Sequence, residues 1–240
     1  MGQVSDRWAV ELIGSEADQK AWHILLKPPF DPCVEEIKYQ HGDYLALRSS
    51  TFDGIATSAE VHQAAKQLFA TLNVTMSTLG DTDPVTNGAV VEFVPDGDPK
   101  KDHHVEITGI SIRARAGFVD ITVKDAKGRV RDPPPAPSRA QLWMRATALD
   151  PEIGSALRYL RGNPGWLELY KAYEVVRSMP NRGIPTSEIK RFTQTANAGE
   201  RHHPNDKNKP HKRPMELWEG RAFVTQWVSA AIDDILAKNP

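Results

Sequence analysis

The chain has 240 residues, 40% of them hydrophobic and 25% charged, with a formal net charge of −1; this composition excludes a chain kept disordered by low hydrophobicity and high net charge. Cys33 is the only cysteine, which excludes an intrachain disulfide and favours the reducing cytoplasm as the compartment. Neither an apolar secretion signal nor a run of about 18 apolar residues is found, so we expect no membrane partner.

The first predicted elements are a strand and a helix. Residues 8–13, WAVELI, alternate in polarity and are rich in strand-forming residues, so they predict a strand. Ser15 is placed to cap a helix that runs to about Leu26. Residues 35–40 and 44–48 predict two further strands, because a turn sequence separates them.

A longer helix and more strands complete the first half. Thr57 followed by Glu60 is a capping-box pattern, and apolar residues then recur at helical spacing as far as Leu72. Three strand candidates follow, at residues 89–94, 104–114 and 118–124. The fold class predicted is therefore α+β, with an N-terminal α+β domain of mostly antiparallel sheet over residues 1–131.

A proline-rich segment separates this region from the second half. Residues 132–138 contain four prolines, which cannot donate the backbone hydrogen bonds of a helix or central strand, so we expect a linker. Beyond it the apolar spacing is helical. Five helices are predicted, at residues 138–149, 150–161, 164–179, 186–198 and 214–238. Short connections favour antiparallel packing, so residues 139–240 are expected to form an all-helical bundle.

Aromatic residues of the predicted helices are assigned to the core of that bundle. The residues in question are Trp143, Trp166, Tyr170, Tyr173, Trp218 and Trp227. Stacking of nucleobases on them is the alternative. Their spacing favours the core, with Trp218 and Trp227 on one apolar stripe of the last helix.

Positive charge is concentrated in the second half. Residues 1–131 contain 14 Lys and Arg against 19 Asp and Glu, whereas residues 132–240 contain 16 against 12. The most basic segment, residues 190–213, is a candidate for binding a nucleic-acid backbone. Its cationic candidates are Lys190, Arg191, Lys207, Lys209, Lys212 and Arg213. The alternative is an ordinary solvent-exposed connection, since loops favour this composition.

Three adjacent residues in this segment suggest a catalytic role. Arg201 is followed by His202 and His203. A histidine that titrates near neutral pH can act as a general acid or base, and an arginine can stabilise the negative charge of a phosphorane. Arg201 and His202 are therefore candidates for cleaving RNA, with Asn197 and His203 as further candidates.

The second half resembles the HEPN domains, on the basis of an all-helical bundle in which Arg201 and His202 follow the helix at residues 186–198. This resemblance implies a metal-independent endoribonuclease, or an RNA-binding protein, of the bacterial defence or toxin type, often as a homodimer. In the family the arginine and histidine are spaced by four to six residues, whereas here Arg201 and His202 are adjacent. Asn197 with Arg201 and His202 is an alternative set.

No cofactor or metal site is predicted. His103 and His104 are zinc donors by type, but adjacent strand residues point to opposite faces and no paired ligand spacing supports them. Phosphate-loop, dinucleotide-binding and nucleophile-elbow patterns are lacking. The favoured function is a non-catalytic binding or regulatory module with a protein or RNA partner. The remaining alternative is an enzyme of the N-terminal sheet, which requires His103 or His104 to meet carboxylates.

Overall fold

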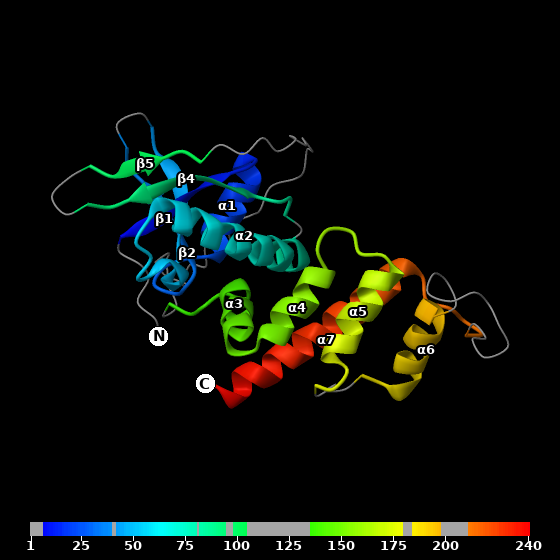
Figure 1. The fold of residues 1–240 in the computed structure, drawn as a ribbon. Coiled ribbons are helices and arrows are strands. Elements are labelled where there is room, and N and C mark those ends of the chain that lie inside the picture. The colour runs from blue at the N-terminus through cyan, green and yellow to red at the C-terminus, as the bar shows by residue number, and fades with distance from the viewer. Residues whose placement is uncertain are drawn as a thin grey trace, which may run out of the picture. The chain divides into compact units, whose positions relative to one another are not determined.

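A computed structural model shows the arrangement of the chain (Figure 1). It describes residues 7–39, 42–80, 82–94, 98–104, 135–179, 184–197 and 211–240. The chain divides into two compact units, Met1–Leu142 and Trp143–Pro240. The first contains an antiparallel sheet with helices and the second is helical, which confirms the predicted α+β class.

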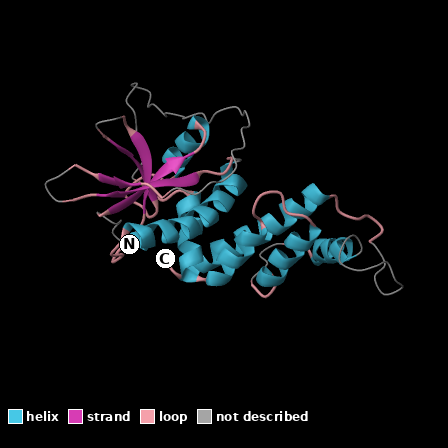
Figure 2. Ribbon diagram, turned by 45° about the horizontal axis from the view of Figure 1, so that its top comes forward, coloured by secondary structure: helices cyan, strands magenta, loops and turns pink. Residues whose placement is uncertain are grey.

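The first unit is built on a five-stranded antiparallel sheet, seen as one twisted sheet in Figure 2. Its strands are β1 (Trp8–Ile13), β2 (Cys33–Ile37), β3 (Tyr44–Arg48), β4 (Thr86–Glu92) and β5 (Lys100–Asp102). They lie in the order β2-β3-β1-β4-β5. The first strand is central because Val10 pairs with Leu47 on one side and with Val90 on the other.

Two helices of this unit, α1 (Glu16–Leu25) and α2 (Ser58–Gly80), pack against each other through Trp22 and Phe69, whose ring centroids are 5.3 Å apart. Their first turns form as predicted. Asp18 N donates to Ser15 Oγ at 3.1 Å, and Thr57 N donates to Glu60 Oε2 at 3.2 Å while Glu60 N donates to Thr57 Oγ1.

A buried side chain connects the start of α3 to the first unit. The division between the units lies within α3 (Arg139–Leu149), beyond the predicted linker. Gln141 is 2% exposed, and its Nε2, which has two hydrogens to donate, lies 2.9 to 3.0 Å from the carbonyl oxygens of Lys27, Phe30 and Pro32. These bonds hold the first turn of α3 in the first unit.

The second unit contains the remaining helices. These are α4 (Pro151–Tyr159), α5 (Trp166–Val176), α6 (Thr186–Ala196) and α7 (Leu217–Lys238). With α3 they match the five predicted helices. Asp150 caps α4 by accepting a hydrogen bond from Glu152 N at 2.9 Å, with Pro151 in the first helical position. Helix α5 packs against both α4 and α7.

An aromatic cluster fills the interior between α5, α6 and α7. The Phe192 ring lies 5.3 Å from Tyr173 and 4.9 Å from Phe223, and Trp227 meets Tyr173 edge-on at 5.1 Å. Such tilted and offset arrangements are favoured by the ring quadrupoles. The assignment of Tyr173 and Trp227 to the core is confirmed, with exposed fractions of 8% and 2%.

Of the strand predicted at residues 104–114 only His104 is described; residues 105–114 and the strand predicted at 118–124 lie outside the described residues. The described part of the sheet also contains a short strand at Lys100–Asp102, which the sequence did not predict. In the described part of the chain, no helix combines the length and apolar character needed to cross a membrane.

Candidate nucleic-acid interface

Half of the predicted site lies outside the described residues. This applies to Arg201, His202, His203, Lys207 and Lys209. The chain is described up to Asn197, which ends α6 and is half-buried, and again from His211. The positions of these two flanks follow from contacts made by α6.

The two flanks are fastened to each other by Thr195. Its hydroxyl donates to Arg191 O at 2.8 Å and accepts a hydrogen bond from Met215 N at 3.0 Å. Thr195 and Met215 are both buried, so this contact is shielded from water. The last turn of α6 and the residue that leads into α7 are therefore held side by side.

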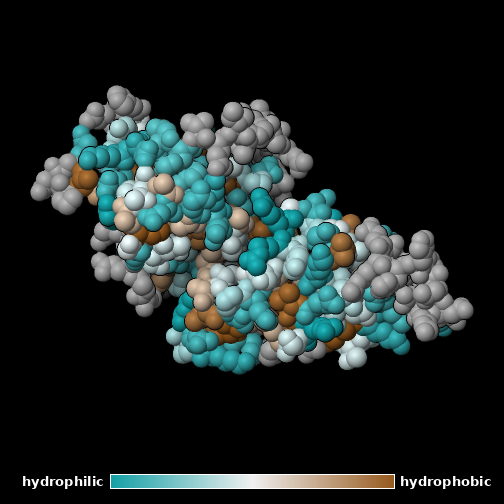
Figure 3. Space-filling view, in the orientation of Figure 1, coloured by the Kyte–Doolittle hydropathy of each residue, from teal (hydrophilic) through white to brown (hydrophobic). Residues whose placement is uncertain are grey.

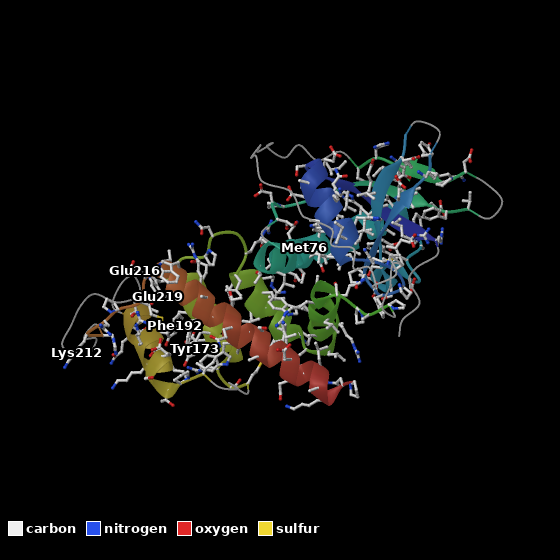
Figure 4. All side chains as sticks on the ribbon, turned by 180° about the vertical axis from the view of Figure 1, so that it is seen from behind. Met76, Tyr173, Phe192, Lys212, Glu216 and Glu219 are labelled. Carbon is white, nitrogen blue, oxygen red and sulfur yellow. The ribbon has the colours of Figure 1, made fainter. Side chains whose placement is uncertain are left out.

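Arg191 forms a second set of contacts between α6 and the start of α7. Its Nη2 lies 3.0 Å and 2.9 Å from the two carboxylate oxygens of Glu219, and its Nε donates to Arg213 O at 3.0 Å. Glu219 also accepts a hydrogen bond from Glu216 N at 2.8 Å, as part of the capping box of α7. Figure 4 shows Glu216 and Glu219 together at this end of the unit.

These contacts shift the pKa of Glu219 and occupy the hydrogen-bond donors of Arg191. The bond from Glu216 N, and after it the bond from Arg191, lowers the pKa of Glu219 below its ordinary value. The sequence predicted that Arg191 binds phosphate. In the structure its guanidinium is engaged by a carboxylate and backbone carbonyls, so we do not count it among the groups that face a ligand.

The other described cations of the segment differ from Arg191. Lys190, Lys212 and Arg213 are exposed. Within the part of the chain that the structure describes, their side chains form no ion pair. Figure 4 shows Lys212 beside α6. These three cations can therefore approach an anionic ligand without breaking a contact of the fold.

Trp218 corrects one prediction. The sequence pattern predicts a core position beside Trp227, but Trp218 is 69% exposed. Nine residues at about 100° per residue amount to half a turn beyond two full turns, so the two side chains lie on opposite sides of α7. The buried stripe of α7 contains Phe223 and Trp227 instead. Trp218 presents its indole to solvent.

The start of α7, which carries Trp218, packs closely against the start of α5 and the residues before it. Gly220 lies against the ring of Trp166, so closely that a Cβ atom at position 220 would be 2.6 Å from Cζ3 of that ring. Arg221 Nε donates to Pro164 O at 3.0 Å. We refer to Lys190, Lys212, Arg213 and Trp218 as the basic end of the helical unit.

A second polar cluster lies in the sheet unit. His104 stacks on His62 with ring centroids 4.6 Å apart, and its Nε2 is 3.5 Å from Asp102 Oδ2. The carboxylate contact required for an enzyme of the N-terminal sheet is thus present. Ser58 donates its hydroxyl proton to the carboxylate of Asp102, so in the described residues this hydroxyl is paired with a carboxylate and not with a histidine base.

Other features of the sheet unit add little to a catalytic interpretation. Among the described residues, no three metal-ligating side chains converge. A pocket of about 380 Å³ is lined by Arg7, Trp8 and residues 52–56, but Arg7 is paired there with Glu92 at 2.8 Å. The surface seen in Figure 3 is mainly hydrophilic, with scattered hydrophobic residues, as is usual for a folded protein.

Comparison of the chain with protein-family models, with curated proteins and with solved structures finds no match. The resemblance to HEPN domains therefore stays a prediction from the sequence. The function has to be argued from the geometry of the basic end.

Proposed function

We propose that the chain is a non-catalytic binding module whose helical unit binds single-stranded RNA at the basic end. The observation that carries this proposal is the exposed indole of Trp218, on the helix that begins just after two exposed cations. Proteins that bind single strands combine an aromatic platform for a base with cations for the phosphates.

Single strands fit this surface better than duplexes. Bases in a duplex are already stacked on each other, whereas an unpaired base can stack on an exposed ring, which contributes about 1–3 kcal/mol per base. Lys190, Lys212 and Arg213 supply positive charge for the backbone. The sequence adds Arg201, Lys207 and Lys209 between the two flanks.

The test is binding of a fluorescein-labelled single-stranded RNA, followed by fluorescence anisotropy. We expect Trp218→Ala to weaken binding about tenfold, because one stacking platform is removed. The double variant Lys212→Ala/Arg213→Ala should also weaken binding and should reduce the salt dependence by about two phosphate contacts.

A matched control lies on the same helix. Lys238 is near the opposite end of α7, about 30 Å from Trp218 along the helix axis, so Lys238→Ala should bind as the wild type does. If Trp218→Ala and the double cation variant both keep wild-type affinity, the proposal is wrong and a protein partner becomes the better hypothesis.

A HEPN-like endoribonuclease is the second candidate. It is favoured by the fastening at Thr195, which keeps both flanks of the segment with Arg201 and His202 at the basic end. RNA incubated with the protein in EDTA and analysed on a denaturing gel separates the two candidates. Cleavage that is lost in His202→Ala would replace the non-catalytic proposal, and intact RNA with both proteins would support it.

A further inference from the structure

Three side chains of the sheet unit surround the ammonium group of Lys101. Lys101 Nζ lies 3.0 Å from Glu11 Oε1, 3.5 Å from the ring centroid of Tyr44 and 5.5 Å from that of Tyr39. The two tyrosine rings are 6.1 Å apart and inclined at 73°. Two steeply inclined aromatic faces with a carboxylate are the arrangement by which proteins recognise ammonium ions.

The sheet register builds this arrangement. Glu11 lies opposite Ala46, and Lys101 lies opposite Val91, which in turn pairs with Ala9. These three partners are small or branched apolar residues, are fully buried, and form one cluster against which Tyr44 packs. We call Glu11, Tyr39 and Tyr44 the cage; the cage therefore lies over a buried apolar cluster of the sheet.

The walls of the cage are partly shielded from water. Glu11 and Lys101 have side-chain exposures of 17% and 16%, where electrostatic attraction is screened less than at an open surface. Burial, and after it the charge of Glu11, raises the pKa of Tyr44 to about 12. The phenol thus stays neutral at physiological pH and offers its ring face to a cation.

Lys101 is held in the cage by a short element. It belongs to β5, which has three residues and lies at the edge of the sheet, where it pairs with β4. The neighbouring Lys100 and Asp102 are exposed. The occupant of the cage is therefore attached through the shortest strand of the sheet.

We infer that Glu11, Tyr39 and Tyr44 form a binding site for alkylated ammonium groups, and that Lys101 occupies this site and blocks it. The ligand class is a trimethylammonium group, which is larger and less strongly hydrated than the lysine ammonium and suits aromatic faces. It can come from a methylated lysine of a partner or from a small quaternary amine. This inference concerns the sheet unit and does not depend on the proposed RNA binding.

The experiment empties the cage and measures ligand binding to the full chain. Tetramethylammonium and N-acetyl-trimethyllysine methylamide are titrated separately, and binding is followed by the NMR shifts of the Tyr39 and Tyr44 ring protons. We expect Lys101→Ala to bind at least one probe tenfold or more tightly than the wild type. The added substitution Glu11→Gln should abolish this gain.

Two further variants test the mechanism of blocking. Lys101→Met keeps an unbranched side chain in the cage and should bind no better than the wild type. Lys100→Ala changes the neighbouring exposed lysine of the same strand and should also behave as the wild type. Tighter binding of the trimethyllysine probe by Lys101→Ala points to a methylated protein partner, and equal binding of both probes points to a small amine.

The inference is overturned if Lys101→Ala unfolds cooperatively, with a native circular dichroism spectrum, and yet binds neither probe more tightly than the wild type. Lys101→Ser, a second truncation, provides the same comparison should Lys101→Ala not fold. Equal gains in Lys100→Ala and Lys101→Ala would also overturn it, because the effect would then not come from the cage.

Discussion

The two units use different contacts to hold together segments that are far apart in the sequence. In the sheet unit, half-buried polar side chains reach distant backbone groups: Asn73 bonds both the N–H and the carbonyl of Val85 at 2.8 Å, and Asp31 accepts a hydrogen bond from Ser50 N. In the helical unit, aromatic rings fill the core, and hydrogen bonds between α6 and the start of α7 gather around Arg191.

This difference indicates where a ligand can bind. Two cations of the sheet are engaged by carboxylates, since Arg48 pairs with Glu35 at 2.9 Å and Lys101 pairs with Glu11. At the basic end, by contrast, Lys190 of α6 and the described cations of the segment that leads into α7 are exposed, as is Trp218 in the first turn of α7. Charges that the fold does not use are the ones available to a partner.

The largest expected effect concerns the closed interior of the sheet unit. Cys33 is 1% exposed, and burial, followed by the charge of Glu35, raises its pKa to about 12. Since the thiolate is the reactive form, its reaction with Ellman's reagent should be about a thousandfold slower than that of an unfolded cysteine. Rapid labelling of the native protein at pH 8, compared with the protein in guanidinium, would show instead that this unit opens readily.

The next effect tests the long-range bonds of the sheet unit. Gln141→Leu removes the amide that serves three carbonyl groups, and we expect the free energy of unfolding in urea to fall by about 2–4 kcal/mol. Ser138→Ala is the control, because it removes only the cap contact to Gln141 N and should cost about 1 kcal/mol. Equal losses in the two variants would mean that Gln141 is no more than part of a helix cap.

A smaller effect is expected in the helical unit. Gly220→Ala places a methyl group against the ring of Trp166, and the cost of overpacking should exceed the gain in helix propensity by about 1–2 kcal/mol. Ala222→Gly, at an exposed position of the same helix, should destabilise by about 1 kcal/mol through propensity alone. Urea unfolding measures both, and a stabilised Gly220→Ala would show that α5 and α7 pack loosely.

The smallest effect is a pH dependence at the basic end. The pKa of Glu219 is lower in the folded protein than in the unfolded chain, so its contribution is present above the unfolded value of about 4.3 and is lost as the pH falls through the folded value. Glu219→Gln should therefore lower the thermal midpoint by a few degrees at most at pH 7, and leave it unchanged near pH 2. Glu188→Gln, which removes a longer contact to Arg191, should have less effect at either pH.

Local signals in the sequence predicted the helices well. The cap at Ser15, the capping box of Thr57 with Glu60, and the start of α4 at Asp150 each depend on residues within one turn of helix. Such patterns need no knowledge of tertiary contacts. The five helices of the second half were found for the same reason.

Positions separated by more than one helical turn were predicted less well. Trp218 was placed on the stripe of Trp227, although nine residues separate them and the helical period puts them half a turn apart. The polar strand Lys100–Asp102, which pairs with β4, was missed, because hydrophobic pattern alone does not identify a polar edge strand.

The partners of the charged residues could not be predicted. Arg191 and Glu219 are 28 residues apart, and Lys101 and Glu11 are 90 residues apart. Neither pair leaves a signal in residue spacing, because the helix packing and the sheet register bring them together. The sequence therefore identified the cations but not the ones that the fold engages.

The fastening at Thr195 has a consequence for the history of this protein. Met215 is held against α6 whatever lies between the two residues, and the entropy of closing a loop rises by only about 0.6 kcal/mol for each doubling of its length. Insertions, deletions and exchanges of charge between residues 198 and 210 should therefore be tolerated by the bundle. Under the proposed RNA binding, such changes would alter the choice of ligand without unfolding the helical unit.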